Sequence, residues 1–102
     1  MNVIALPPVQ KFLRQLDGRT YGRSVRAINL LIEYGHALAM PYAKPVGKGL
    51  FELRVEGAAS VRMLYGFCNG TAVIAFGHKK QRPALGSDAI ALARERLARY
   101  CQ

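Results

Sequence analysis

The chain has 102 residues, of which 51% are hydrophobic and 21% are charged. This composition predicts one folded domain over residues 1–102 and excludes a disordered chain. Fifteen lysines and arginines against six acidic residues give a net charge of +9, which favours a polyanionic partner, either nucleic acid or an acidic protein. No apolar run reaches the ~18 residues of a transmembrane helix, and the first residues lack the basic region of a signal peptide. We therefore expect a cytoplasmic protein that makes no membrane contact.

The two cysteines, Cys68 and Cys101, form no CxxC motif and no cluster with histidines. Structural zinc sites group four such ligands at short spacings, so the sequence predicts no metal site. No cofactor is expected either. Two isolated cysteines in a chain of this kind are typical of reduced thiols in a cytosol.

The amino-terminal third predicts a short strand followed by a helical hairpin. The strand covers Val3–Leu6 and stops at two prolines. Four apolar residues at helical spacing predict the first helix, which ends at Asp17-Gly18: Val9, Phe12, Leu13 and Leu16. A second helix is expected from about Thr20 to Tyr34, with Gly35 as its carboxyl cap. Residues 37–49 contain two prolines and two glycines and predict a loop.

The remainder predicts three consecutive strands and a closing helix. The strands are expected over Leu50–Val55, Val61–Phe67 and Thr71–Phe76. The last two are joined by Asn69-Gly70, the strongest short hairpin signal in the chain. Residues 77–86 are expected to form a basic loop or a strand extension. The helix runs over Ser87–Tyr100, with Ser87 as its amino-terminal cap.

The order β-α-α-β-β-β-α predicts an α+β fold, an antiparallel meander with the helices on one face. Residues 44–82 are its most basic part, with two acids, Glu52 and Glu56, against seven bases: Lys44, Lys48, Arg54, Arg62, Lys79, Lys80 and Arg82. Strand alternation leads us to expect Arg54, Arg62 and the lysine pair on one open face of the sheet. The alternative is a solvated face on which the two glutamates neutralise the arginines.

The segment Lys44-Pro-Val-Gly-Lys-Gly-Leu-Phe-Glu-Leu-Arg54 resembles the KPLGxGLWELR signature of the RelE/HigB-like toxins of bacterial toxin–antitoxin pairs, in particular their phage-derived branch. Arg62-Met-Leu-Tyr65 resembles the R-x-x-Y segment of the family's second strand, and Lys79-Lys80 resembles the double lysine that ends its last strand. The element order matches as well, so the resemblance covers nearly the whole chain. One departure lies at Gly77, where the family usually has an aromatic residue.

The resemblance implies a ribosome-dependent mRNA endonuclease that needs no metal, in which the RNA 2′-hydroxyl attacks the adjacent phosphate. Such chemistry requires a base, cations for the developing charge and a proton donor for the leaving oxygen. Arg54 and Arg62 are expected to clamp the phosphate, because a guanidinium can hold two of its oxygens. Other catalytic candidates are Lys79, Lys80 and His78, a possible acid or base. The residues expected to bind RNA are Lys44, Lys48, Tyr65 and Arg82.

Several alternatives stay open on the sequence alone. Arg54 and Arg62 can be surface arginines paired with the neighbouring glutamates, and Tyr65 and His78 can be structural. At the level of function, the runner-up is a ParE-like toxin that binds a topoisomerase without cleaving RNA. A third reading is a decayed prophage-type toxin that only binds its antitoxin. In each case the resemblance implies a cognate antitoxin, a helix-turn-helix protein whose acidic segment meets the basic chain.

Overall fold

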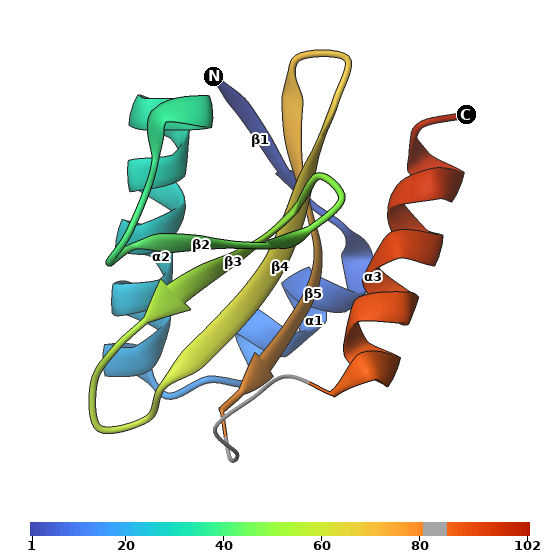
Figure 1. The fold of residues 1–102 in the computed structure, drawn as a ribbon. Coiled ribbons are helices and arrows are strands. Elements are labelled where there is room, and N and C mark those ends of the chain that lie inside the picture. Colours follow the sequence, from blue (N-terminus) through green and yellow to red (C-terminus); the bar gives the residue numbers. More distant parts are fainter. Residues whose placement is uncertain (81–85) are drawn as a thin grey trace.

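The structure is a computed structural model that describes residues 1–80 and 86–102. Within them the chain forms a five-stranded sheet, three α-helices and one short 3-10 helix (Figure 1). In chain order the elements are β1 (Asn2–Ala5), α1 (Pro7–Arg14), α2 (Gly18–Tyr34), η1 (Gly35–Ala37), β2 (Ala43–Gly47), β3 (Leu50–Val55), β4 (Val61–Cys68), β5 (Thr71–Lys79) and α3 (Ser87–Tyr100). The predicted α+β class and the predicted order of strands and helices are confirmed.

The strands lie in the order β1-β5-β4-β3-β2. Strands β2 to β5 form antiparallel pairs in chain order. On its other side, β5 pairs in parallel with β1. The β4–β5 hairpin closes at the predicted Asn69-Gly70 turn, where both residues have positive φ. This topology puts β3, β4 and β5 side by side, which brings together the basic residues of three separate sequence segments.

The prediction that all helices cover one face of the sheet is wrong. Helices α1 and α2 pack on one face, where Val9 and Leu31 join a core with alternate residues of β3, β4 and β5. Helix α3 packs on the other face, where Ala93 meets Leu64 and Ala75. Figure 1 shows the sheet between α2 and α3. The central strands are therefore buried on both sides, which explains why every residue of β4 except Phe67 is buried.

Part of the predicted loop over residues 37–49 is ordered secondary structure. It contains β2 and the last residue of η1, and β2 pairs with β3 as the edge strand of the sheet. Pro45 is compatible with this position because an edge strand has one side free of ladder hydrogen bonds. The tight turn between β2 and β3 needs positive φ at Gly47, Lys48 and Gly49, which is the conformational freedom that the two glycines supply.

Helix boundaries differ from the predicted ones for local reasons. Asp17 does not end the first helix but caps the second, since its carboxylate accepts a hydrogen bond from the Thr20 amide at 3.1 Å. Gly35 is the carboxyl cap of α2, as predicted. Ser87 is the first residue of α3 rather than its cap; the cap position is held by Gly86.

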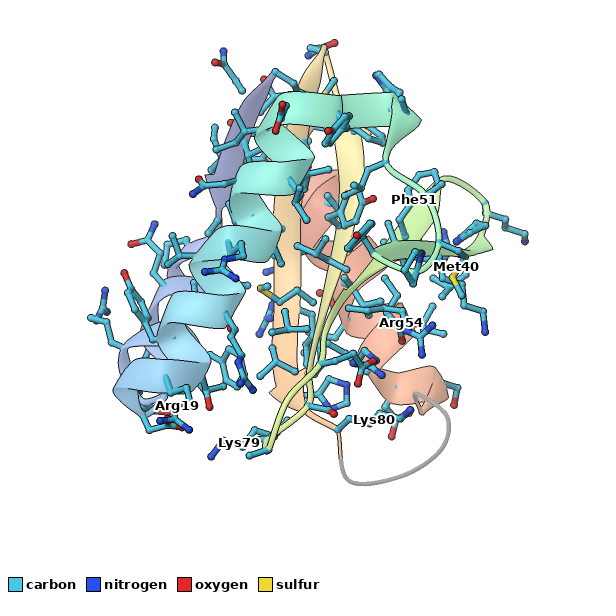
Figure 2. All side chains as sticks on the ribbon, turned by 90° about the vertical axis from the view of Figure 1, so that its left-hand side faces the viewer. Arg19, Met40, Phe51, Arg54, Lys79 and Lys80 are labelled. Atoms are coloured by element: carbon cyan, nitrogen blue, oxygen red, sulfur yellow. A yellow bond between two sulfur atoms is a disulfide. The ribbon has the colours of Figure 1, made fainter. Side chains whose placement is uncertain are left out.

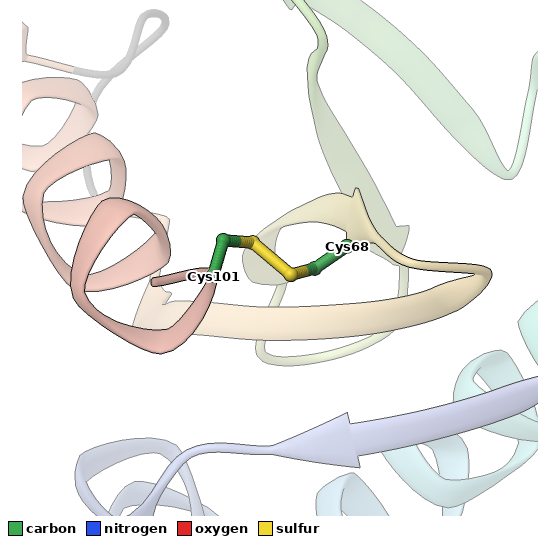
Figure 3. Close-up of a disulfide and its surroundings, with 2 residues drawn as sticks. All are labelled: Cys68 and Cys101. Atoms are coloured by element: carbon green, nitrogen blue, oxygen red, sulfur yellow. A yellow bond between two sulfur atoms is a disulfide. The ribbon is translucent and has the colours of Figure 1, made fainter.

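The cysteines are not free thiols in this structure. Cys68, at the end of β4, and Cys101, directly after α3, form a disulfide (Figure 3). The expectation of reduced thiols is therefore wrong. The pair is not apparent from the sequence, because its two positions are 33 residues apart along the chain. Within the described residues, no helix is both long and apolar enough to span a membrane.

Candidate functional site

Three predicted site residues lie side by side across three strands. Arg54 of β3 is the direct cross-strand partner of Arg62 of β4, and Arg62 is the partner of His78 of β5. Cross-strand partners project from the same face of a sheet. This face is the one that α3 also contacts, and Arg62 lies two residues along β4 from Leu64 of the α3 core. The predicted common face for Arg54 and Arg62 is confirmed.

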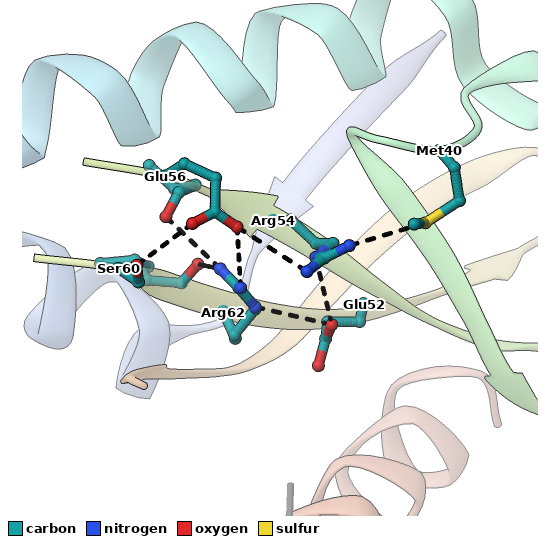
Figure 4. A network of polar contacts seen from close by, with 8 residues as sticks. Met40, Glu52, Arg54, Glu56, Ser60 and Arg62 are labelled. Carbon is teal, nitrogen blue, oxygen red and sulfur yellow. Dashed lines mark hydrogen bonds and ion pairs between the residues drawn. The ribbon is translucent and has the colours of Figure 1, made fainter. Parts of the chain in front are cut away.

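The face is not an open basic surface, however, because Glu52 and Glu56 neutralise the two arginines (Figure 4). Arg62 is 2% exposed. Its Nη2 donates to Oε1 of Glu56 at 2.8 Å, and its Nη1 donates to the carbonyl oxygens of Val61 and Val55 at 3.1 and 3.5 Å. Arg62 thus donates its hydrogen bonds to other groups of the protein. Its geometry fits the alternative of an arginine paired with the neighbouring glutamates, rather than an exposed clamp for a phosphate.

Arg54 is placed differently. Its side chain is 24% exposed, and its Nε and Nη2 lie 3.8 Å from the Oε1 atoms of Glu52 and Glu56, which is ion-pair range but too long for hydrogen bonds. Its Nη1 lies 3.8 Å from the sulfur of Met40. The buried Nε has no hydrogen-bond partner within the described part of the chain. Arg54 therefore keeps unused donors for an anionic ligand.

His78 holds the other buried polar atom without a partner. Its Nε2 lacks a hydrogen bond in the described residues. Burial lowers the pKa of His78 below 6.5, with the neighbouring Arg62 adding to that effect and Glu52 opposing it. The imidazole is consequently uncharged at neutral pH and able to accept a proton. Native structures seldom leave buried polar atoms unpaired, so two on one row of a sheet call for an explanation.

Glu56 organises the network from the β3–β4 turn. Its Oε2 accepts a hydrogen bond from the Ser60 hydroxyl at 3.2 Å, while Oε1 meets both arginines. Partial burial works against its ionisation, but Arg62, Ser60 and Arg54 together lower its pKa below 4.5. Neither Ser60 nor Met40 was recognised as part of this group from the sequence, because they come from turns whose path only the fold defines.

The two lysines of the predicted pair separate. Lys79 is exposed and is the cross-strand partner of Val61, which belongs to the α1–α2 core, so it projects from the opposite face to His78. Lys80 follows on the His78 side, half-buried, and its amide donates to the Ser60 carbonyl at 2.8 Å. Figure 2 shows the two side chains on opposite sides of the strand end. The structure brings only Lys80 toward the arginine row.

The residues predicted to bind RNA are also divided. Lys44 is exposed and is the partner of Glu52 across β2 and β3, so it shares the face of Arg54. Lys48 is exposed at the β2–β3 turn, where α3 holds the backbone: Arg94 donates to the carbonyls of Gly47 and Lys48 at 2.7 and 3.1 Å. Arg82 lies outside the described residues.

Tyr65 belongs to the core and not to an RNA-binding surface. It is 1% exposed and projects toward α1 and α2, where its ring packs against Phe51 at a centroid distance of 5.4 Å. Burial raises the pKa of its hydroxyl to about 12. This burial contradicts the expectation that Tyr65 contacts RNA and fits the structural alternative.

Gly77, where the resembling family usually has an aromatic residue, has no room for a larger side chain. A Cβ atom at this position would lie 2.8 Å from Cδ2 of Phe12, so the ring from α1 fills the space beside the strand. Phe12 thus supplies an aromatic side chain from α1 beside position 77.

Within residues 1–80 and 86–102, no three His, Cys, Asp or Glu side chains gather closely enough to hold a metal ion.

Comparison with known proteins identifies a family for the chain. No curated protein matches the chain. One family model does, and it covers residues 11–98, which include the arginine row, Lys80 and all of α3 up to its last turn. On this match, the chain belongs to the family described as phage derived protein Gp49-like (DUF891), a family of RelE/HigB-like toxins.

Proposed function

We propose that the chain is the toxin of a type II toxin–antitoxin pair and acts as a metal-independent endoribonuclease on mRNA at the ribosome. The observation that carries the proposal is the row Arg54, Arg62 and His78, in which a neutral imidazole and an arginine each keep a buried polar atom that has no hydrogen-bond partner among the described residues. RNA cleavage by its own 2′-hydroxyl requires a proton acceptor beside cations, and this row combines the two.

In this proposal His78 is the general base. Its Nε2 takes the proton of the 2′-hydroxyl, the 2′-oxygen attacks phosphorus, and the bond to the 5′-oxygen breaks to give a cyclic phosphate. Arg54 turns from its long contacts with Glu52 and Glu56 toward the phosphate oxygens, where it gains the hydrogen bonds it now lacks. Lys80 supplies the proton to the leaving oxygen. Lys44 extends the positive track for the RNA backbone.

Arg62 is a positioning residue in this scheme. Its hydrogen bond to Glu56 and its 3.6 Å contact with Glu52 hold both glutamates in place, and these in turn limit where Arg54 can point. Lys79 is left out of the proposed machinery because it projects from the other face of the sheet.

Expression of the chain without a partner in a bacterial host tests the proposal. We expect growth arrest with cleavage of translated messages mapped by primer extension, loss of both in His78→Ala and Arg54→Ala, and retention of both in Lys79→Ala. Circular dichroism and thermal unfolding confirm that each variant is folded. Arrest with intact messages and halted DNA replication would favour the ParE-like alternative, and absence of arrest in the wild type would favour a decayed toxin.

A further inference from the structure

A groove on the other side of β3 combines a basic end with an apolar end. Two adjoining cavities of about 290 and 310 Å³ lie between α2 and the segment from η1 to β3, and they share Leu30 and Tyr42. We call them together the α2 groove. The basic end is lined by Arg23 and Arg26 and by Arg54, whose charge is already paired with Glu52 and Glu56, and the apolar end is lined by Tyr34, Leu38 and Met40.

The basic end carries charge that the protein does not neutralise. Arg23 and Arg26 lie one helical turn apart on α2, are exposed, and form no ion pair within the described residues. The Arg23 guanidinium extends across the β3–β4 turn, where it would touch a Cβ atom at Gly57. The carboxylate of Glu56 lines this end but is already engaged by Arg62 and Ser60. An acidic ligand would therefore find unmatched positive charge here.

The apolar end presents large side chains to solvent. Tyr34, Met40 and Tyr42 are 52%, 56% and 50% exposed. Tyrosine, methionine and arginine are the residues enriched in the cores of protein interfaces, whereas a track for single-stranded nucleic acid combines basic side chains with stacking aromatic ones along its whole length. Because the charge here is confined to one end, the groove suits a protein segment better than an RNA backbone.

We propose that the α2 groove docks a segment of a partner protein with acidic residues at one end and large apolar residues at the other. The inference rests on the proposed function in one respect only, which is that it takes this partner to be the antitoxin. From Arg23 to Tyr34 is eleven residues of helix, or about 16 Å at 1.5 Å per residue. A segment that fills the groove therefore separates its acidic and apolar anchors by about eleven residues if helical, or about five if extended.

The test uses the protein encoded beside the chain as the partner, with binding measured by calorimetry and surface kinetics. We expect Arg23→Glu/Arg26→Glu to weaken binding about 30-fold or more, mainly by slower association, because charge reversal turns attraction into repulsion. Tyr34→Ala/Tyr42→Ala is expected to weaken it about 10-fold or more by faster dissociation. The control is Lys11→Glu/Arg14→Glu on α1, which makes the same charge change at the same spacing and should alter binding less than about 3-fold.

The outcomes separate this inference from the proposed function. If the wild type is toxic and rescued by the partner but the α2 pair binds it normally, the inference is wrong and the proposed function stands. If the wild type is not toxic yet binds the partner through Arg23 and Arg26, the inference stands and the proposed function is wrong. Equal losses of affinity in the α2 and α1 variants would show that net charge alone explains the effect, and would overturn the proposal of a docking groove. Loss of binding to a 12-nucleotide oligouridine in the α2 pair, with partner binding intact, would assign the groove to RNA instead.

Discussion

Arg54 and Arg62 stand directly opposite each other on β3 and β4, and Oε1 of Glu52 lies 3.8 Å from Nε of the first and 3.6 Å from Nε of the second. Like charges opposed across two strands repel. One carboxylate shared between them removes that repulsion, and Glu56 repeats the arrangement at the other end of the guanidinium groups. The catalytic row that we propose is therefore held in place by two acidic residues.

Glu52→Gln tests this relationship. Loss of the shared carboxylate leaves the buried Arg62 with less compensation, and we expect the free energy of unfolding to fall by about 1–3 kcal/mol, less than a fully buried pair because Glu56 remains and is solvent-exposed. Urea unfolding measures the change. The matched control is Glu95→Gln, which breaks the exposed pair with Arg99 on α3 and should cost less than about 0.5 kcal/mol. Equal effects would show that Glu52 has no special role.

The lowered pKa of His78 predicts how stability depends on pH. Between pH 6.5 and the lower pKa of the folded state, the unfolded chain binds a proton at this residue that the folded chain does not. The free energy of unfolding should therefore fall as the pH decreases from about 6.5, and His78 should contribute nothing to the slope above it. In His78→Gln this part of the slope should vanish.

The measurement is denaturant unfolding of the wild type and of His78→Gln at several pH values between 7.5 and 5. Glu56 does not interfere, since its contribution is lost only below pH 4.5. A slope that is the same in both proteins would mean that burial does not disfavour the charged imidazole. In the cleavage assay a general base with this lowered pKa predicts a rate that rises with pH and has its midpoint below pH 6.5.

Tyr65 offers a direct contrast between a core role and an RNA-binding role. Tyr65→Ala should reduce the free energy of unfolding by about 3–5 kcal/mol, because it empties a buried aromatic site. Tyr65→Phe keeps the ring packed against Phe51 and should leave RNA binding and growth arrest unchanged. Loss of activity in a stably folded Tyr65→Phe protein would return the hydroxyl to the functional site.

A substitution at Gly77 tests the contact between α1 and β5, and the same substitution at Gly22 is its control. Gly77→Ala places a methyl group within 2.8 Å of the Phe12 ring and should destabilise the protein by about 1–3 kcal/mol. Gly22→Ala, on an open face of α2 with nothing within 4 Å, should stabilise it by about 0.5–1 kcal/mol through helix propensity. Thermal unfolding of the two variants gives the signs, and a neutral Gly77→Ala would show that Phe12 can move aside.

The sequence by itself determined most of the elements and their order, with β2 the exception because it lies in the predicted loop. Period-2 alternation in Leu50–Val55, the Asn69-Gly70 turn and the helical spacing of the closing segment are local signals, written in residues next to one another. The same alternation put Arg54 beside Glu52 and Glu56 and left open whether the arginines were free or neutralised. Local patterns of this kind survive into the fold because each element must bury its own apolar side.

Only the tertiary structure decided which of those residues meet. It set α3 on the opposite face from α1 and α2, joined Cys68 to Cys101, buried Arg62 and Tyr65, and turned Lys79 away from Lys80. The physical reason is that burial and pairing depend on strand order and register, which bring residues from β3, β4 and β5 to one row. No short stretch of sequence contains that information, because a register shift of one residue would send every side chain of a strand to the other face.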